Sequence, residues 1–242
     1  MRYDYSRKNG RMRGFEYEMP DGRKLKTEKS PNRGVSNRDW NTFRLIQKMT
    51  FSDQERDMPT LERTVNFIEE ALDKKAGLHK ALLLLGDFAV EDERGEEVQA
   101  WAVHEVVGYR CAEDLPAYRK VRAEGLWCGG TAWGEYVEHA WLDLVNLPDE
   151  VRELAKTAVV FESLSNLINM LSTTGRRYES GVRENEIRRM IHAQTYGIYD
   201  FDTIRQVVPC SEVLNIFTQV MERTLTELNG VVKRELSRRS IS

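Results

Sequence analysis

The sequence predicts an α+β protein with a mixed N-terminal half, holding two β-hairpins and two helices, and a C-terminal half that is an α-helical bundle. Alternating polar and apolar residues early in the chain indicate strands, whereas apolar residues three or four apart dominate after residue 115. The chain lacks β-α-β alternation and a glycine-rich phosphate loop, which argues against a nucleotide-binding parallel sheet. Its 242 residues suffice for one large domain or two smaller ones.

The first predicted hairpin lies in a basic leader, residues 1–38. Aromatic and charged residues alternate from Gly14 to Met19, and a second alternating run extends from Arg23 to Glu28. The intervening Pro20-Asp21-Gly22 has turn chemistry. We therefore expect a hairpin that anchors a basic arm, formed by the first thirteen residues, to the rest of the protein.

Residues 39–115 form the predicted mixed segment. Ser36 or Asn37 can cap a helix that ends near Met49, with Asp39 at capping-box spacing from Ser36. Pro59 opens a second helix, closed near Gly77. Two apolar runs, Leu82–Val90 and Val98–Val107, then flank an acidic loop and predict the second hairpin. The alternative for the leucine-rich first run is a buried helix.

Residues 116–242 are predicted to be helical, either as a separate segment or sharing one core with residues 39–115. Gly125, Gly129 and Gly130 look like helix breakers. The expected helices, placed by apolar residues at helical spacing, are Leu115–Glu124, Trp133–Val145, Pro148–Leu171, Val182–Tyr196 and one from Ser211 past Gly230.

Charge is distributed unevenly along the chain. The net charge is −3, but residues 1–38 hold eleven Lys/Arg and five Asp/Glu, a balance of +6. Residues 231–242 hold four basic residues and one acidic residue, a balance of +3, which leaves −12 for residues 39–230. Basic ends of this kind bind polyanions or the acidic body of a neighbouring copy.

Cysteine usage and hydropathy indicate the cellular setting. Three cysteines and no Asn-x-Ser/Thr sequon favour a reducing environment, and no apolar run is long enough to span a membrane. We therefore expect an intracellular, cytoplasmic protein without a transmembrane segment, open to peripheral contact with an anionic membrane. Arg11-x-Arg13 and Arg23-Lys24-Leu25-Lys26 loosely resemble a bipartite nuclear-import signal.

Two basic clusters are the candidate nucleic-acid contacts. Guanidinium and ammonium groups neutralise phosphates, and the leader adds aromatic residues that can stack on unpaired bases. The second cluster surrounds a glycine-bracketed loop, and its alternative is a solvated helix face paired with Glu179, Glu184 and Glu186. The candidates are Arg7, Lys8, Arg11, Arg13, Arg23, Lys24 and Lys26 in the leader, and Arg176, Arg177, Arg183, Arg188 and Arg189 in the second cluster.

Catalytic and metal motifs are weak by comparison. Cys128, ahead of an expected helix, could be a nucleophile with His139 or His104 as its base, and its alternative is a buried apolar cysteine. No Cys-x-x-Cys or His-x-x-x-His pair preforms a zinc shell. We therefore expect no metal and no cofactor.

The layout favours a non-enzymatic, self-assembling RNA-binding structural protein that forms homo-oligomers. Nucleocapsid-like and matrix-like virion proteins have such basic ends and an acidic body, which is an analogy of layout alone. The alternatives are a protein–protein adaptor with an acidic body, and an enzyme that uses Cys128 and His139.

Overall fold

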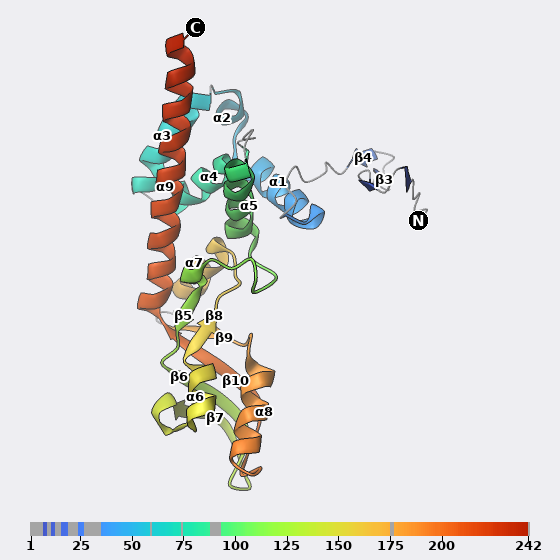
Figure 1. The fold of residues 1–242 in the computed structure, drawn as a ribbon, viewed down its shortest axis with the longest axis vertical. Coiled ribbons are helices and arrows are strands. Elements are labelled where there is room, and N and C mark those ends of the chain that lie inside the picture. The colour runs from blue at the N-terminus through green and yellow to red at the C-terminus, as the bar shows by residue number, and fades with distance from the viewer. Residues whose placement is uncertain are drawn as a thin grey trace. The chain divides into compact units, whose positions relative to one another are not determined.

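The computed structural model describes residues 7–8, 11–12, 16–18, 24–26, 35–58, 60–73, 75–87, 93–174 and 177–241. Of residues 1–34 only the backbone of four short strands is described. The predicted α+β class is confirmed, because long helices coexist with antiparallel strands (Figure 1). The chain divides into two compact units: unit 1 is Met1–Val107 with Thr224–Ser242, and unit 2 is Gly108–Arg223.

The predicted leader hairpin is confirmed. Its strands are β3 (Glu16–Glu18) and β4 (Lys24–Lys26), which pair antiparallel with Glu16 opposite Lys26. A smaller pair, β1 (Arg7–Lys8) and β2 (Arg11–Met12), precedes it within the expected arm. The turn predicted at residues 20–22 lies outside the described residues.

Unit 1 is mainly helical. The first helix begins where the cap was predicted, since the Ser36 hydroxyl accepts a hydrogen bond from the Asp39 backbone N–H. Trp40 and Phe43 are buried and stacked, with ring centroids 5.7 Å apart. Its helices are α1 (Asn37–Thr50), α2 (Asp53–Asp57), α3 (Thr60–Asp73), α4 (Lys75–Leu85) and α5 (Glu93–Val107), joined by the second part of α9 (Cys210–Ile241).

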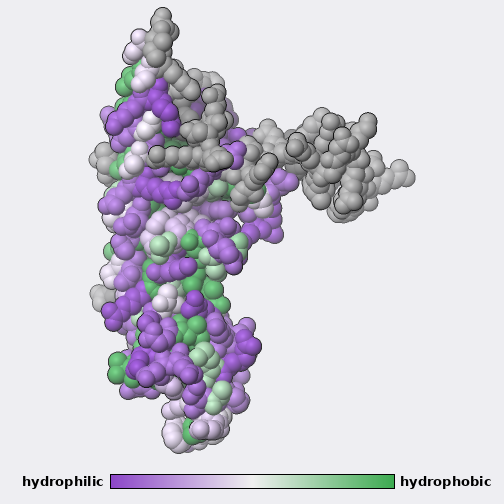
Figure 2. All heavy atoms as spheres, in the orientation of Figure 1, coloured by the Kyte–Doolittle hydropathy of each residue, from purple (hydrophilic) through white to green (hydrophobic). Residues whose placement is uncertain are grey.

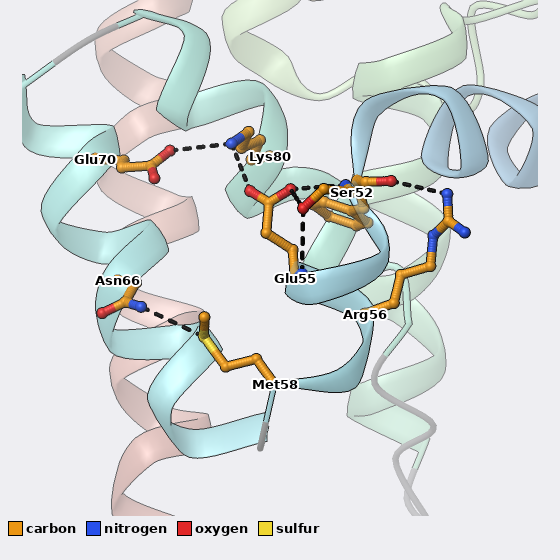
Figure 3. A network of polar contacts seen from close by, with 8 residues as sticks. Ser52, Glu55, Arg56, Met58, Asn66, Glu70 and Lys80 are labelled. Atoms are coloured by element: carbon orange, nitrogen blue, oxygen red, sulfur yellow. Dashed lines mark hydrogen bonds and ion pairs between the residues drawn. The ribbon is translucent and has the colours of Figure 1, made fainter.

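A polar network ties the short helix α2 to α3 and α4 (Figure 3). Lys80 Nζ lies 2.6 Å from Glu55 Oε1 and 3.5 Å from Glu70 Oε2. Burial opposes ionisation of Glu55, but hydrogen bonds from Lys80 and Ser52 outweigh it and lower the pKa of this carboxyl. The bond to Glu55 raises the pKa of Lys80. These contacts complete a capping box at Ser52 and hold the helices together, which is a structural role.

The second predicted hairpin is wrong. Its first run begins within α4, its second lies within α5, and the two helices pack together. The run Leu82–Leu85 is buried on every side, so it shows no helical periodicity in the sequence. The alternative weighed for this run, a buried helix, is the one that the structure has.

Unit 2 contains a four-stranded antiparallel sheet in the order β7-β6-β10-β9, with helix α8 along it (Figure 1). A two-stranded ladder pairs β5 with β8. The strands are β5 (Lys120–Arg122), β6 (Gly125–Ala132), β7 (Glu135–Asp143), β8 (Thr157–Val159), β9 (Arg177–Ser180) and β10 (Tyr199–Pro209). The helices are α6 (Asp149–Ala155), α7 (Leu164–Thr174), α8 (Glu184–Gln194) and the first part of α9.

The predicted helical bundle of the C-terminal half is therefore corrected. The expected helix Trp133–Val145 is strand β7, and the supposed helix breakers Gly125, Gly129 and Gly130 lie inside strand β6. Apolar residues occupy both faces of β7, with Ala140 and Leu142 towards the core and Trp141 on the other side. Apolar residues on both faces hide the period of two that normally identifies a strand.

Two further expected helices are also corrected. The range Leu115–Glu124 holds only a single 3₁₀ turn (Ala117–Arg119) followed by β5. The helix expected from Pro148 to Leu171 is interrupted by strand β8, whose residues pair with β5. Its apolar stripe is a chance alignment of three separate elements.

Helices α8 and α9 confirm the predictions for the end of the chain. Helix α8 falls within the expected range Val182–Tyr196, and α9 extends from Cys210 to Ile241. Among the helices in the described part of the chain, none is both long and apolar enough to cross a membrane.

Candidate functional site

The four-stranded sheet has two chemically different faces. Residues paired across neighbouring strands share a face, and successive residues of a strand alternate between faces. On the inner face Leu126, Cys128 and Ile204 are buried against Ile187 and Ile191 of helix α8. This face forms a core of unit 2.

The outer face carries two tryptophans and an arginine in one row. Trp141 of β7 pairs with Trp127 of β6, which pairs with Arg205 of β10. The two indole rings meet edge to face, with centroids 5.3 Å apart. Trp141 is 39% exposed and Tyr136, further along β7, is 72% exposed. We call Trp127, Tyr136, Trp141, Arg177 and Arg205 the aromatic face.

Gly125 gives Trp141 its place on this face. A Cβ at Gly125 would lie 2.3 Å from Cζ2 of Trp141, so the indole lies directly against glycine backbone. The Arg177 guanidinium lies 5.6 Å from the centre of the Trp141 ring, and its Nε lies 3.2 Å from Glu124 Oε1. The contact is a cation–π arrangement at the surface. Glu124 therefore orients a cation over an exposed aromatic ring.

Arg205 is anchored more firmly than Arg177. Its Nη1 lies 2.5 Å from Glu184 Oε2, and a Cβ at Gly181 would collide with the same guanidinium. Glu184 Oε1 also accepts a hydrogen bond from the Ile204 backbone N–H. The sequence analysis gave Glu184 as a partner of the second arginine cluster. Glu184 instead binds Arg205, which does not belong to that cluster.

The structure separates the predicted second cluster. Arg177 lies on the aromatic face, whereas Arg183 caps helix α8 and Arg188 and Arg189 belong to it, and this helix covers the inner face. These three arginines donate to backbone oxygens: Arg183 to Leu154 at 3.4 Å, Arg188 to Asp202 at 3.3 Å and Arg189 to Asn185 at 3.2 Å. Arg176 lies outside the described residues.

The leader residues can be placed only in part. The backbones of five predicted contacts lie in short strands: Arg7 and Lys8 in β1, Arg11 in β2, and Lys24 and Lys26 in β4. Arg13 and Arg23 lie outside the described residues. Nucleic-acid contact by the leader stays a prediction.

The cysteine-nucleophile alternative finds no support in the geometry. Cys128 lies on the inner face, buried in the core, and burial raises the pKa of its thiol to about 12. His139 lies on exposed strand β7 and His104 on helix α5 of unit 1. At neutral pH Cys128 is a protonated, sequestered thiol, which is the apolar alternative weighed for it. Within the described residues no three metal-binding side chains cluster.

A second polar cluster in unit 2 is structural. Arg119 is fully buried, donates to the Glu162 backbone oxygen at 2.7 Å and lies over the Tyr109 ring. The Tyr178 hydroxyl donates to the Glu162 carboxylate, and burial together with that charge raises the pKa of Tyr178. These contacts connect the loop after β8 with strand β9 and the segment before β5.

Two aromatic residues occupy left-handed turns at one end of unit 2. Trp133 (φ 56°) and Gly134 (φ 81°) form the two-residue turn between β6 and β7, where Asn-Gly is the usual pair. Tyr196 (φ 50°) follows α8, with bonds from Tyr196 N to Ala193 O (3.4 Å) and from Gly197 N to His192 O (2.9 Å). This is a Schellman motif with tyrosine at the position that glycine normally fills.

Two hydrogen bonds connect the two turns. The Trp133 backbone N–H donates to Ile198 O at 3.1 Å, and its indole N–H donates to the Tyr199 hydroxyl at 3.2 Å. A left-handed conformation costs a non-glycine residue roughly 1–2 kcal/mol. Trp133 is nevertheless 74% exposed and Tyr196 96% exposed, so burial does not offset this strain.

The fold and its site define an α+β protein whose antiparallel sheet carries a helix on one face and exposed aromatic and cationic side chains on the other. A family model named AbiTii matches residues 65–229, which is more than half of the chain and includes the aromatic face and both left-handed turns. The chain therefore belongs to the AbiTii family. Searches of curated proteins and of solved structures give no significant match.

Sequence reasoning found Arg177 but missed the tryptophans beside it. A usable signal was present, because Trp133-Gly134 has glycine at the second position of a two-residue turn. Reading Leu126–Leu142 as a hairpin about that turn brings Trp127 opposite Ala140, next to Trp141, and the irregularity between Cys128 and Gly130 shifts the register by one residue to give the observed pair Trp127–Trp141.

Proposed function

We propose that the protein binds single-stranded RNA, with the aromatic face of unit 2 as the base-stacking surface. One observation carries the proposal: Trp141, Trp127 and Arg205 form a row across three strands, with Arg177 stacked over Trp141. Single-strand binders of this kind combine a β-sheet that displays aromatic rings with cations that follow the phosphates.

Burial supports this role over a purely structural one. Strand β7 is at the edge of the sheet, and along it Tyr136 and Trp141 expose aromatic surface that contributes little to a core. Tyr136 has a ring face available to a base, whereas Trp141 lies between the Gly125 backbone and Arg177, so a base that stacks on Trp141 must displace the Arg177 guanidinium. Arg177 has the planar, bidentate geometry that suits a phosphate or a base edge.

The carboxylates near the aromatic face set the strength of binding. Glu124 holds Arg177, and Glu184 holds Arg205. A phosphate that binds Arg177 must compete with Glu124. The basic leader would supply the remaining electrostatic attraction, which fits the predicted contacts Arg7, Lys8, Arg11 and Arg13.

Family membership is compatible with this proposal. AbiTii is an abortive-infection family, and the matched range contains each of the strands that builds the aromatic face. Homo-oligomeric assembly, the other part of the sequence-based hypothesis, is a separate proposal.

Binding of a labelled single-stranded RNA to the full chain, followed by fluorescence anisotropy, tests the stacking surface. Trp141→Ala should weaken binding by roughly 5- to 150-fold, because one base–aromatic stack is worth about 1–3 kcal/mol. Trp141→Phe should recover part of that loss. Val65→Ala, which shortens an apolar side chain of the same 39% exposure on α3, is the matched control. Unchanged affinity in Trp141→Ala would refute the proposal.

Glu124→Gln gives a test of opposite sign. Removing the carboxylate removes one competitor of phosphate for the Arg177 guanidinium, so affinity should rise, and Arg177→Gln should abolish the gain. Weaker binding in Glu124→Gln would mean that Arg177 must be held in place by Glu124, which contradicts competition with phosphate.

The leader is tested through salt dependence. Replacing Arg11 and Arg13 with glutamine should flatten the plot of log affinity against log salt concentration by about 0.7 for each lost phosphate contact. An unchanged slope would exclude both residues as RNA contacts while leaving the aromatic face untested by this experiment.

A further inference from the structure

The end of unit 2 formed by the two left-handed turns is a second exposed surface, which adjoins the Tyr136 end of the aromatic face because Asp200 and Tyr136 both pair with Thr131. It comprises Trp133, Tyr196 and Ile198, with Glu135 and Asp200 beside them, and we call it the turn surface. The part of the molecule around the β6–β7 turn is pale to green in Figure 2, in contrast with the purple of most other exposed regions.

We propose that the turn surface binds the basic C-terminal end of helix α9 from a second copy of this chain. The inference does not rest on RNA binding. It rests on the complementary chemistry of two exposed surfaces. The turn surface carries aromatic and acidic side chains, and the helix end carries apolar and basic side chains.

The turn surface is built to display its aromatic rings. Trp133 and Tyr196 stand at backbone positions that favour asparagine and glycine, and both project into solvent. Such strain at exposed residues is typical of binding sites rather than of packing. Hydrogen bonds from Trp133 to Ile198 and Tyr199 hold the two turns in one arrangement, so the surface is preorganised.

The charges on this surface select a cationic partner. Four exposed carboxylates belong to these turns and the adjoining strands: Glu135, Glu138, Asp200 and Asp202. His192, in the last turn of α8, has its Nδ1 3.8 Å from Asp200 Oδ1. Phosphates would be repelled by these carboxylates, so RNA on the adjoining aromatic face would keep its phosphates at the Arg177 and Arg205 end. Lysine and arginine would be attracted here both to the carboxylates and to the aromatic faces.

The end of α9 has the matching chemistry. Lys233 and Arg234 are exposed, and Leu236 is half exposed. Lys233 and Leu236 are three residues apart on a helix, so they lie on the same side and present a cation next to an apolar group. Arg238 and Arg239 continue the basic sequence. A helix end of this composition fits an aromatic surface bordered by acids.

A contact between two different surfaces either closes reciprocally in a two-fold dimer or is heterologous. Each copy then offers one turn surface and one helix end, and successive copies join head to tail into a closed ring or an open filament. In both arrangements the two surfaces can be altered separately on different chains, which allows a mixing experiment.

The test uses two charge-reversed full-length chains and light scattering. Chain one carries Glu135→Lys, Glu138→Lys and Asp200→Lys, so both of its surfaces are basic. Chain two carries Lys233→Glu and Arg234→Glu, so both of its surfaces are acidic. Each chain alone should associate more than about tenfold more weakly than the unaltered protein. An equimolar mixture should recover assembly, because each basic surface then meets an acidic one.

A second pair of variants controls for folding. Tyr196→Gly and Trp133→Asn place the favoured residues in the two turns, so the fold is preserved while the aromatic rings are removed. Both should reduce assembly. Tyr196→Gly should leave the melting temperature unchanged or higher, whereas Trp133→Asn relieves backbone strain but loses the indole bond to Tyr199, so its melting temperature should change little.

Three outcomes would overturn the proposal. The unaltered chain could stay monomeric at every concentration tested. The mixture of charge-reversed chains could fail to associate. Finally, Tyr196→Gly could leave self-association unchanged and instead abolish binding to vesicles of phosphatidylcholine and phosphatidylserine, which would assign the turn surface to a membrane.

Discussion

The two faces of the sheet in unit 2 are made from alternate residues of the same strands, yet they have different roles. In β6, Leu126 and Cys128 enter the core, while Trp127 between them lies on the outer face beside Trp141. The inner face stabilises the fold by burying apolar surface. The outer face leaves aromatic surface in water, which folding does not require. We infer that the residues that stabilise the fold and the residues that bind a partner occupy opposite faces, because successive side chains of a strand point to opposite sides of the sheet.

The largest effect should come from the inner face. Ile204→Ala removes a fully buried side chain from the core below α8, and it should lower the free energy of unfolding by about 2–5 kcal/mol. Tyr136→Ala on the outer face should change it by less than about 0.5 kcal/mol. Urea denaturation followed by circular dichroism measures both. Equal losses of unfolding free energy would mean that both faces stabilise the fold to the same extent.

Cys128 gives the next largest effect and reports on the same face. Cys128→Ser places a hydroxyl in an apolar core, and it should lower stability by about 1–3 kcal/mol. The thiol itself should resist iodoacetamide at neutral pH, since burial raises its pKa to about 12 and blocks access. Exposed Cys111 serves as the internal reference. Rapid labelling of Cys128 in the folded chain would restore the nucleophile hypothesis.

The sequence predicted the helices that begin with local signals. Ser36 and Asp39 are enough to locate the start of α1, because a cap depends on residues within one turn. The hairpin of β6 and β7 depends on distant pairing and on a turn that contains tryptophan instead of asparagine. Its residues Tyr136, Val137, Ala140, Trp141 and Leu144 also match a helical stripe, so the pattern favoured the wrong element.

The candidate site could be predicted only in part for the same reason. The sequence predicted Arg177 as a contact because it lies in a basic segment. Trp127 and Trp141 meet only when β6 pairs with β7 in the observed register, and Trp141 needs the bare backbone of Gly125 beneath it. Neither requirement is local in sequence. Contacts of the leader depend on a partner, which the sequence of one chain does not contain.

The left-handed turns should show a smaller effect of opposite sign. Tyr196→Gly relieves roughly 1–2 kcal/mol of backbone strain, and part of this gain is lost because glycine makes the unfolded chain more flexible. The net expectation is a rise in the free energy of unfolding of about 0.5–1 kcal/mol. Ile198→Gly, two residues away and without a positive φ, should instead be destabilising. A loss of stability in Tyr196→Gly would show that the ring contributes to packing.

The smallest effect should come from the ion pair on the aromatic face. Arg177 and Glu124 are both more than one third exposed, and solvent screens such pairs, so Arg177→Gln should lower stability by no more than about 1 kcal/mol. The same substitution removes the cation stacked on Trp141, and it should weaken RNA binding far more than it weakens the fold. Thermal melts and anisotropy titrations on one preparation compare the two quantities. If melting and binding changed in proportion, the outer face would be part of the core after all, and the division between the two faces would be wrong.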